Sequence, residues 1–256
     1  CKMPNPKTLQ FVGAKSYQGE LKSFYVQANN DDKLDLLKNL IYKVGNVPTI
    51  IFCNHREAVE RINDLLFEHG IPTGIFHGAL KQEHRERELI KLRNQSSNIL
   101  LATDLASRGI DIPHVKNIIH YQLPPKKDAF IHRNGRTARM EANGNSFIVL
   151  KADEKLPYFA SSGIEEFSIS TYSDIDLTTD YVTIYLNLGK KNKINKVDIV
   201  GLFYKKGGLV NDELGIIEVL DYCAYVAVKR SKAKALINIL RKEKIKKQSF
   251  IIAVSR

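Results

Sequence analysis

Cysteine is scarce in this sequence and long apolar runs are missing, and both absences narrow the class of protein. The three cysteines are odd in number, widely separated and without Cys-x-x-Cys spacing. They therefore predict neither a disulfide framework nor a zinc site, and they favour a reducing, cytoplasmic compartment. No tract of 18 apolar residues occurs, so no membrane span is expected. The first thirty residues lack the apolar core of a signal peptide.

Two further patterns are missing. The sequence has no Gly-x-x-x-x-Gly-Lys-Ser/Thr loop of the kind that cradles phosphates. Gly189-Lys190-Lys191 has neither the spacing nor the hydroxyl that such a loop needs. There is also no Asp-Glu-Ala-Asp run. Position 1 is Cys rather than Met, which predicts a fragment of a longer chain, and a length of 256 residues suits two domains.

The positive charge is unevenly placed. Residues 180–256 carry 16 Lys and Arg against 7 Asp and Glu, whereas residues 1–179 carry 23 against 21. Nearly all of the net charge of +11 therefore belongs to the last third of the chain. A concentration of this kind is typical of a domain that binds a polyanion, and the alternative is a generic solubilising surface.

Residues 132–139 read His-Arg-Asn-Gly-Arg-Thr-Ala-Arg and form a dense cluster of cations. Arg133, Arg136 and Arg139 recur at every third position, so a helical turn would point them the same way. Like charges at that spacing repel, whereas the planar guanidinium fork is well suited to phosphate. The cluster therefore predicts an anion site. The alternative is a solvated basic turn.

A second candidate segment, residues 102–113, follows the short apolar run at 98–101. The run is typical of a buried parallel strand, and loops that leave the carboxyl ends of such strands bind ligands. The loop offers a hydroxyl, two carboxylates, a cation and a glycine, at Thr103, Asp104, Asp111, Arg108 and Gly109. Either aspartate could instead cap a helix.

Residues 32–150 alternate between helical patterns and short apolar strands. Strands are predicted at residues 49–52, 73–76, 98–102, 115–121 and 146–150, with amphipathic helices starting near residues 32, 55 and 80 and a further helix before residue 132. This alternation implies βαβ crossovers and a parallel sheet covered by helices on both faces. We therefore predict an α/β domain over residues 23–160, after an amino-terminal lead-in over 1–22, with a linker over 161–179.

Residues 180–256 predict a separate α+β domain in the order βαββαβ, which matches an RNA recognition motif (RRM). Strands are expected at 181–186, 215–220, 223–228 and 249–254. Asn195 is expected to cap a helix after the first of these strands, and Ser231 a helix after the third.

These segments resemble the motifs of DEAD-box RNA helicases. Residues 50–54 resemble motif IV, Gln82 to Arg85 the Gln-x-x-Arg element, residues 102–113 motif V, and residues 132–139 motif VI. All four occur in family order, with His77-Gly78 between them. The resemblance covers roughly residues 48–150 and implies the carboxy-terminal RecA-like domain of such a helicase.

The resemblance also implies roles for individual residues. Arg136 and Arg139 would be arginine fingers and His132 would couple to the acidic box of the amino-terminal RecA-like domain. ATP and Mg²⁺ would be bound mainly by that domain. In this chain, Asp111, Arg108 and Gly109 would contribute to ATP binding. RNA contacts would come from Asn54, Arg85, Thr103 and Asp104. Two positions depart from the family pattern: His55 stands where a small hydroxyl residue is usual, and Ala138 replaces a glycine.

The last domain resembles the RNA-binding domain of the DbpA subgroup, which targets a hairpin of large-subunit ribosomal RNA. Tyr185 and Tyr225 occupy positions at which RRMs stack bases, while Cys223 stands where a third aromatic is common. Cations of the loops and sheet edge are therefore expected to carry much of the affinity. The candidates are Lys190, Lys191, Lys193, Lys229, Arg230, Lys246 and Lys247.

The sequence thus predicts the carboxy-terminal part of an ATP-dependent ribosomal-RNA helicase that acts in large-subunit assembly. The expected partners are structured RNA and the amino-terminal domain of the parent chain, and the chain alone is expected not to hydrolyse ATP. One alternative is a non-catalytic RNA-binding adaptor with a RecA-like scaffold, against which the arginines of motif VI count. A DNA translocase of the same superfamily is the other, and the RRM pattern counts against it.

Overall fold

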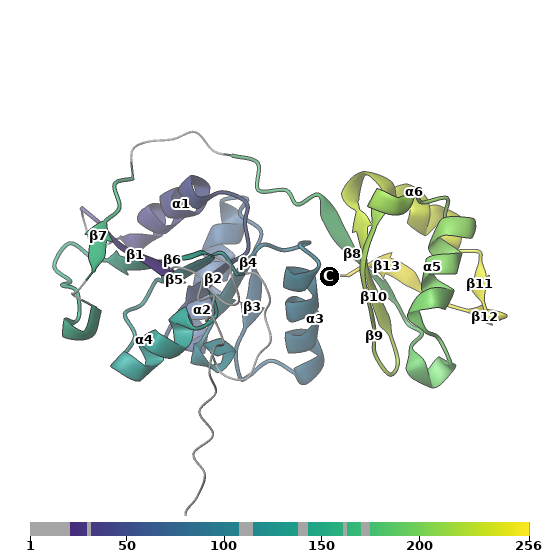
Figure 1. The fold of residues 1–256 in the computed structure, drawn as a ribbon, viewed down its shortest axis with the longest axis horizontal. Coiled ribbons are helices and arrows are strands. Elements are labelled where there is room, and N and C mark those ends of the chain that lie inside the picture. Colours follow the sequence, from purple (N-terminus) through teal and green to yellow (C-terminus); the bar gives the residue numbers. More distant parts are fainter. Residues whose placement is uncertain are drawn as a thin grey trace, which may run out of the picture.

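The chain folds into two units, each with its own sheet and core (Figure 1). The computed structural model describes residues 21–29, 32–107, 115–137, 143–160, 163–169 and 175–255. Within these ranges, no helix combines the length and the apolar character needed to cross a membrane.

The first unit is built on a seven-stranded, wholly parallel sheet in the order β3-β4-β2-β5-β6-β1-β7. Its strands are β1 (Leu21–Gln27), β2 (Thr49–Phe52), β3 (Gly74–Phe76), β4 (Ile99–Ala102), β5 (Asn117–His120), β6 (Gly144–Leu150) and β7 (Ile164–Glu166). Every residue of β2, β4 and β5 is buried, because helices cover both faces of these central strands. The predicted parallel α/β fold is confirmed.

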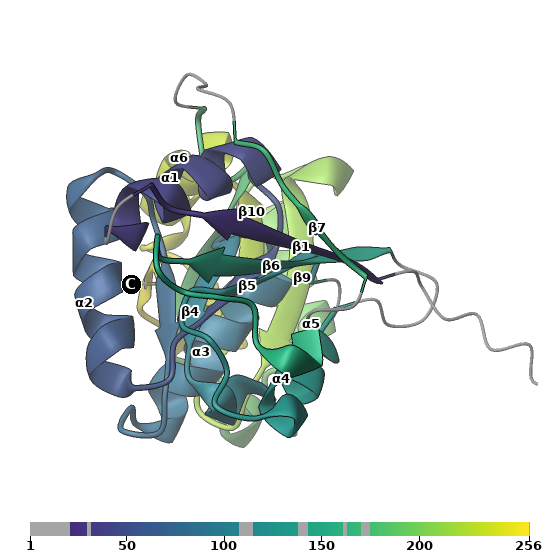
Figure 2. The ribbon, with the colours of Figure 1, turned by 90° about the vertical axis from the view of Figure 1, so that its left-hand side faces the viewer.

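Four helices cover the sheet: α1 (Lys33–Val44), α2 (Arg56–Glu68), α3 (Gln82–Arg93) and α4 (Lys127–Asn134). Alternate strand residues point to opposite faces, so Ile51 packs with α1 and α2 in one core, while Ile50 and Phe52 join Leu92 of α3 in another. Figure 2 shows α1 and α2 on one side of the strands and α3 and α4 on the other.

The first unit is larger than the sequence predicts at both ends. Strand β1 lies between β6 and β7, although the prediction places part of it in a lead-in segment. Strand β7 and the side chains of Phe167 and Leu177 also belong to this unit, in the stretch predicted as a linker. The two units are therefore joined by the few residues that follow Leu177.

The second unit has the predicted βαββαβ order. It consists of β8 (Tyr181–Leu186), α5 (Lys196–Lys205), β9 (Leu214–Val219), β10 (Ala224–Lys229), α6 (Arg230–Leu240) and β13 (Ile252–Val254), with a small hairpin of β11 (Lys244–Ile245) and β12 (Gln248–Ser249). The sheet is antiparallel in the order β13-β8-β10-β9.

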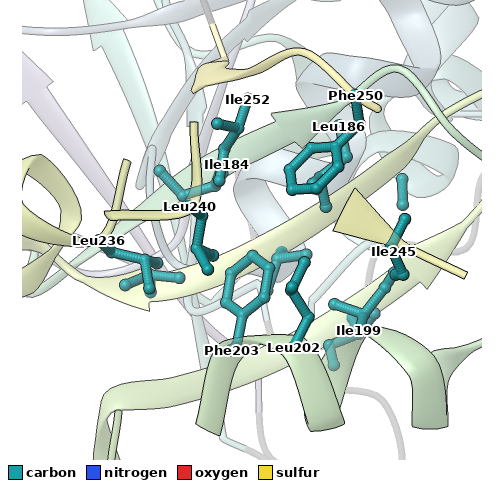
Figure 3. Packing of buried hydrophobic residues seen from close by; sticks show 14 of the residues in the cluster. Ile184, Leu186, Ile199, Leu202, Phe203, Leu236, Leu240, Ile245, Phe250 and Ile252 are labelled. Carbon is teal, nitrogen blue, oxygen red and sulfur yellow. The ribbon is translucent and has the colours of Figure 1, made fainter. Parts of the chain in front are cut away.

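Both helices of the second unit pack on one face of its sheet. Figure 3 shows side chains of α5, α6, β8 and β13 meeting in one apolar core, among them Leu202, Phe203, Leu236, Leu240, Ile184, Leu186 and Ile252. The other sheet face carries Tyr185 and Tyr225 and is left without a helix of its own unit.

Candidate nucleotide and RNA interface

The predicted motifs meet at the carboxyl edge of the parallel sheet, the usual place for ligands in such folds. Asn54 follows the end of β2, Asp104 follows β4, and Gln122 follows β5. Helix α4 brings His132 and Arg133 to the same edge, because α4 contacts the short turn of 3₁₀ helix at Asp104–Ser107.

Arg133 connects these segments from inside the protein. Its side chain is completely buried, with Nε donating to Asp104 Oδ1 at 2.5 Å and Nη2 to Asn54 Oδ1 at 2.8 Å. Its Nη1 donates to the Gln122 carbonyl at 3.0 Å, and the guanidinium lies 5.1 Å from the centre of the Phe52 ring. A buried charge is tolerable only when it is paired and hydrogen-bonded, and here all three nitrogens are engaged.

The prediction that Arg133 shares the direction of Arg136 is therefore wrong. Helix α4 ends at Asn134 and Gly135 follows as its cap, so the residues of this motif do not continue on one helical face. His132 is exposed and Arg136 is half-buried, and Arg133 is buried and pairs with Asp104. Arg139 lies outside the described residues.

The end of α4 is held by two further buried polar groups. Asn134 Oδ1 accepts from Ser146 Oγ at 2.8 Å and lies 2.9 Å from His120 Nε2. Burial, with the nearby Arg133 charge, lowers the pKa of His120 to about 3. The ring is therefore neutral near pH 7, and because an amide oxygen only accepts, Nε2 carries the proton.

The segment after α4 is anchored through Thr137. Its hydroxyl donates to the Val115 carbonyl at 2.7 Å, and the two residues form a parallel bridge. Thr137 is 4% exposed. Arg136 thus stands between two fixed points, the end of α4 and this bridge, so its backbone position is defined.

Other residues predicted to bind RNA have contacts inside the protein. Asn54 donates through Nδ2 to the Leu123 carbonyl at 3.0 Å, besides accepting from Arg133. The Asp104 side chain is 36% exposed and pairs with Arg133. Thr103 follows the end of β4 and Arg85 lies near the start of α3, and both are half-buried. Arg108, Gly109 and Asp111 lie outside the described residues.

Sequence reasoning missed the internal roles of Arg133 and His120. Arg133 has the same residue type and spacing as its neighbours, and only the end of α4 separates their directions. His120 gives a clearer signal, because it directly follows the two isoleucines of a short, wholly buried strand. His77 is likewise buried, at 1% exposure, with Nε2 3.4 Å from Glu60 Oε1.

In the second unit, two loops bring predicted RNA-binding lysines together. Lys190, Lys191 and Lys193 lie exposed between β8 and α5. Lys246, in the turn between β11 and β12, donates to the Lys193 carbonyl at 2.8 Å and pairs with Asp198 at 2.7 Å. Lys247 is exposed in the same turn. The loops therefore form one basic surface.

Three of the remaining candidates in the second unit, Arg230, Tyr185 and Tyr225, face the first unit or the connection. Arg230 Nε donates to the Thr179 carbonyl at 2.6 Å, which the sequence does not predict, and Lys229 is half-buried. Tyr185 and Tyr225 lie with ring centres 5.6 Å apart, and Tyr225 is only 8% exposed. Both tyrosines line a cleft of about 560 Å³ whose other wall is α3.

Comparison with known families matches both units. Residues 32–141 match the helicase conserved C-terminal domain, and residues 183–254 match the DbpA RNA binding domain. The "ATP-dependent RNA helicase DbpA" of Bacillus subtilis is 27% identical over 272 residues, covering 95% of this chain. The chain belongs to the DEAD-box helicase family. It corresponds to the carboxy-terminal region of a DbpA-type member, and it spans 57% of the length of the B. subtilis protein.

Solved DEAD-box structures share the fold of the first unit. The E. coli DEAD-box protein SrmB, solved with regulator of ribonuclease activity A, is 30% identical, with a TM-score of 0.53 over 59% of this chain and 93% of that one. S. cerevisiae Dbp5, solved with RNA and ADP BeF3, is 27% identical, with a TM-score of 0.52 over 64% of this chain and 46% of that one. The RecA-like assignment is therefore confirmed.

As a DEAD-box chain, the protein uses Arg133 to hold motifs IV, V and VI to one another through Asn54 and Asp104. Of the two departures from the family pattern, His55 precedes α2 and makes no side-chain capping bond, while Ala138 lies outside the described residues. Among the side chains that the structure describes, no three His, Cys, Asp or Glu residues converge on a possible metal position.

Proposed function

We propose that the chain is the carboxy-terminal part of an ATP-dependent helicase that acts on ribosomal RNA in large-subunit assembly in the cytoplasm. In this proposal the amino-terminal RecA-like domain of the parent holds ATP and Mg²⁺. The chain contributes Arg136 and Arg139 to the charge that develops on the transferring phosphate, and His132 contacts the acidic box. Arginine fingers of this kind accelerate phosphoryl transfer by roughly 10³–10⁵.

The observation that carries this proposal is the buried Arg133 centre. It fixes three motif segments at one edge of the sheet and leaves His132 and Arg136 at or near the surface beside them. A preorganised cation needs no rearrangement at the moment of reaction. A non-catalytic adaptor, the second candidate, would need the fold but no arginine at position 136.

The RNA part of the proposal rests on the basic loops of the second unit. Lys190, Lys191 and Lys193 adjoin Lys246 and Lys247, so several cations can meet one backbone. In the proposal these loops grip a hairpin of large-subunit ribosomal RNA, while Arg85 and Thr103 contact a strand at the first unit. The RRM-like unit counts against the alternative function of a DNA translocase.

The ATPase prediction is tested with this chain alone and joined to the amino-terminal domain of its parent. Alone, the chain is expected to hydrolyse ATP at the background rate, because it lacks a phosphate loop. Joined, it is expected to support hydrolysis that RNA stimulates. Hydrolysis by the separate chain, or none by the joined protein, would contradict the proposal.

The RNA prediction is tested by measuring affinity for a ribosomal hairpin and for duplex DNA at several salt concentrations. The hairpin is expected to bind more tightly, with a steep salt dependence. Replacing Lys190, Lys191 and Lys193 with Gln is expected to reduce the slope of log affinity against log salt by ~0.7–0.9 per lost phosphate contact. Replacing Lys205, the last residue of α5, and Lys242, in the turn after α6, serves as the control. An unchanged slope in the loop variant would refute the assignment of these lysines.

A further inference from the structure

The connection between the two units is unusually short. Leu177 is 6% exposed and packs in the core of the first unit, while Val182 already belongs to the core of the second. Only residues 178–181 lie between them. Asn46 Nδ2 donates to the Thr178 carbonyl at 2.9 Å, so the connection is fastened almost from its start. It lacks the length and composition of a flexible linker.

Thr179 joins both units at the next position. Its side chain is 6% exposed, and its hydroxyl lies 3.3 Å from the Ser96 carbonyl, beyond α3 in the first unit. From the second unit, Arg230 donates to the Thr179 carbonyl at 2.6 Å and to its hydroxyl oxygen at 2.5 Å. A rotation of one unit relative to the other would break these bonds.

A second set of bonds connects the end of α3 directly to the RRM-like sheet. Arg93 Nη1 pairs with Glu218 Oε1 at 2.6 Å. Thr183 Oγ1 accepts from Asn94 Nδ2 at 3.1 Å and lies 2.6 Å from Ser96 Oγ. Thr183 and Asn94 are 1% and 3% exposed, and polar atoms buried so deeply are costly to leave unpaired. We call these five residues the interdomain contact.

The interdomain contact occupies the sheet face that an RRM usually offers to RNA bases. Val182 and Ile184 point into the core of the second unit, so Thr183 and Tyr185 point the other way, toward residues of α3 and its end. Figure 1 shows α3 beside this sheet. Across the cleft from the two tyrosines stand four residues of α3, namely Glu83, His84, Glu86 and Arg87. RNA could lie over this face only if α3 moved away.

We propose that the interdomain contact consists of positioning residues, which hold the RRM-like unit on α3 in one orientation. Polar interfaces between domains usually permit relative motion. Here the short connection and the buried hydroxyls oppose it. Arg85, near the start of α3, and the loop lysines then belong to one rigid body. RNA that is bound by the loop lysines is therefore held at a fixed distance from the first unit. This consequence rests on the proposed function.

The orientation is tested on this chain by ¹⁵N relaxation, which reports the tumbling of each unit. The wild-type units are expected to share one correlation time. Arg93→Glu, which faces Glu218, and Thr183→Arg, on the outer sheet face, are each expected to shorten the correlation time of residues 180–255. The exchanged pair R93E/E218R is expected to restore the common value. Separate tumbling of the wild-type units, or common tumbling in both single variants, would overturn the proposal.

Arg241→Glu is the matched control, because Arg241 is exposed at the end of α6 and makes none of these bonds. It is expected to leave the common tumbling unchanged. Loss of common tumbling in this control would show that any charge reversal separates the units, and would overturn the assignment to Arg93.

The functional consequence is tested in the parent protein with RNAs whose hairpin and duplex are separated by spacers of different lengths. The wild type is expected to prefer one spacer by roughly tenfold in unwinding rate, as an effective-concentration effect. Arg93→Glu is expected to remove this preference while hairpin affinity is retained. An unchanged preference in the variant would overturn the positioning role. Failure of the wild type to bind the hairpin would instead refute the proposed function and leave the tumbling result standing.

Discussion

At the residue scale, two arginines of the same motif differ in what surrounds them. Arg133 is fully buried against Asp104, Asn54 and Phe52, and Arg136 is half-buried three positions later. Residue type and spacing predict both as anion ligands. They could not separate the two, because the difference arises from where α4 ends and from which carboxylate the fold places beside it.

This difference predicts unequal effects on stability. Arg133→Met is expected to lower the free energy of unfolding by roughly 3 kcal/mol, the range for removing one partner of a buried ion pair. Arg136→Met makes the same change in side chain at a half-buried position and is expected to cost less than Arg133→Met. Urea unfolding followed by circular dichroism measures both values. Equal losses would contradict the structural role of Arg133.

At the scale of elements, apolar periodicity predicts the helices and the central strands, because these segments bury one side or both. The sequence does not predict β1, which lies between β6 and β7, or β7, which forms an edge of the sheet. Strand β7 is three residues long and two of its residues are exposed glutamates. Short, charged edge strands carry little apolar signal, so only the pairing with β1 identifies β7.

Helix caps also show how far the sequence alone can predict the structure. Asn195 was predicted to cap α5, and it does so: its side chain accepts from the Asp198 backbone at 3.0 Å, and Asp198 accepts in return from the Asn195 backbone at 2.9 Å. Ser231 was predicted to cap α6 but lies inside the helix, which starts at Arg230 without a side-chain cap. A serine before an apolar repeat suits either position, and the strand β10 that runs directly into α6 decides between them.

The two positions give a matched test. Asn195→Ala is expected to destabilise the second unit by about 1 kcal/mol, because the backbone donors at the start of α5 lose their acceptor. Ser231→Ala is expected to change stability by less than about 0.5 kcal/mol, since no capping bond is lost. Thermal unfolding of the two variants provides the comparison. A larger loss for Ser231→Ala than for Asn195→Ala would contradict this account of the caps.

At the scale of the whole molecule, the sequence predicts two units and the basic character of the second. Their contact could not be predicted. Thr183 alternates with Val182 and Ile184 as a solvent-facing strand residue would, yet it is 1% exposed. Asn94 and Ser96 look like ordinary residues after a helix. Polar side chains give no sequence signal for burial when their partners come from another domain.

The proposed ATP hydrolysis requires residues of this chain and a second domain of the parent protein. The described residues provide a fixed edge with Arg136 and His132, and a basic surface on the second unit. The central claim is therefore that Arg136 acts on a nucleotide bound elsewhere in the parent.

That claim is tested most directly by single-turnover ATP hydrolysis in the parent protein at saturating RNA. Arg136→Ala is expected to lower the rate by roughly 10³-fold or more, the effect of losing an arginine finger. Arg56→Ala, at an exposed position of α2, is the control and is expected to leave the rate unchanged. A rate for Arg136→Ala equal to that of the wild type would contradict the account.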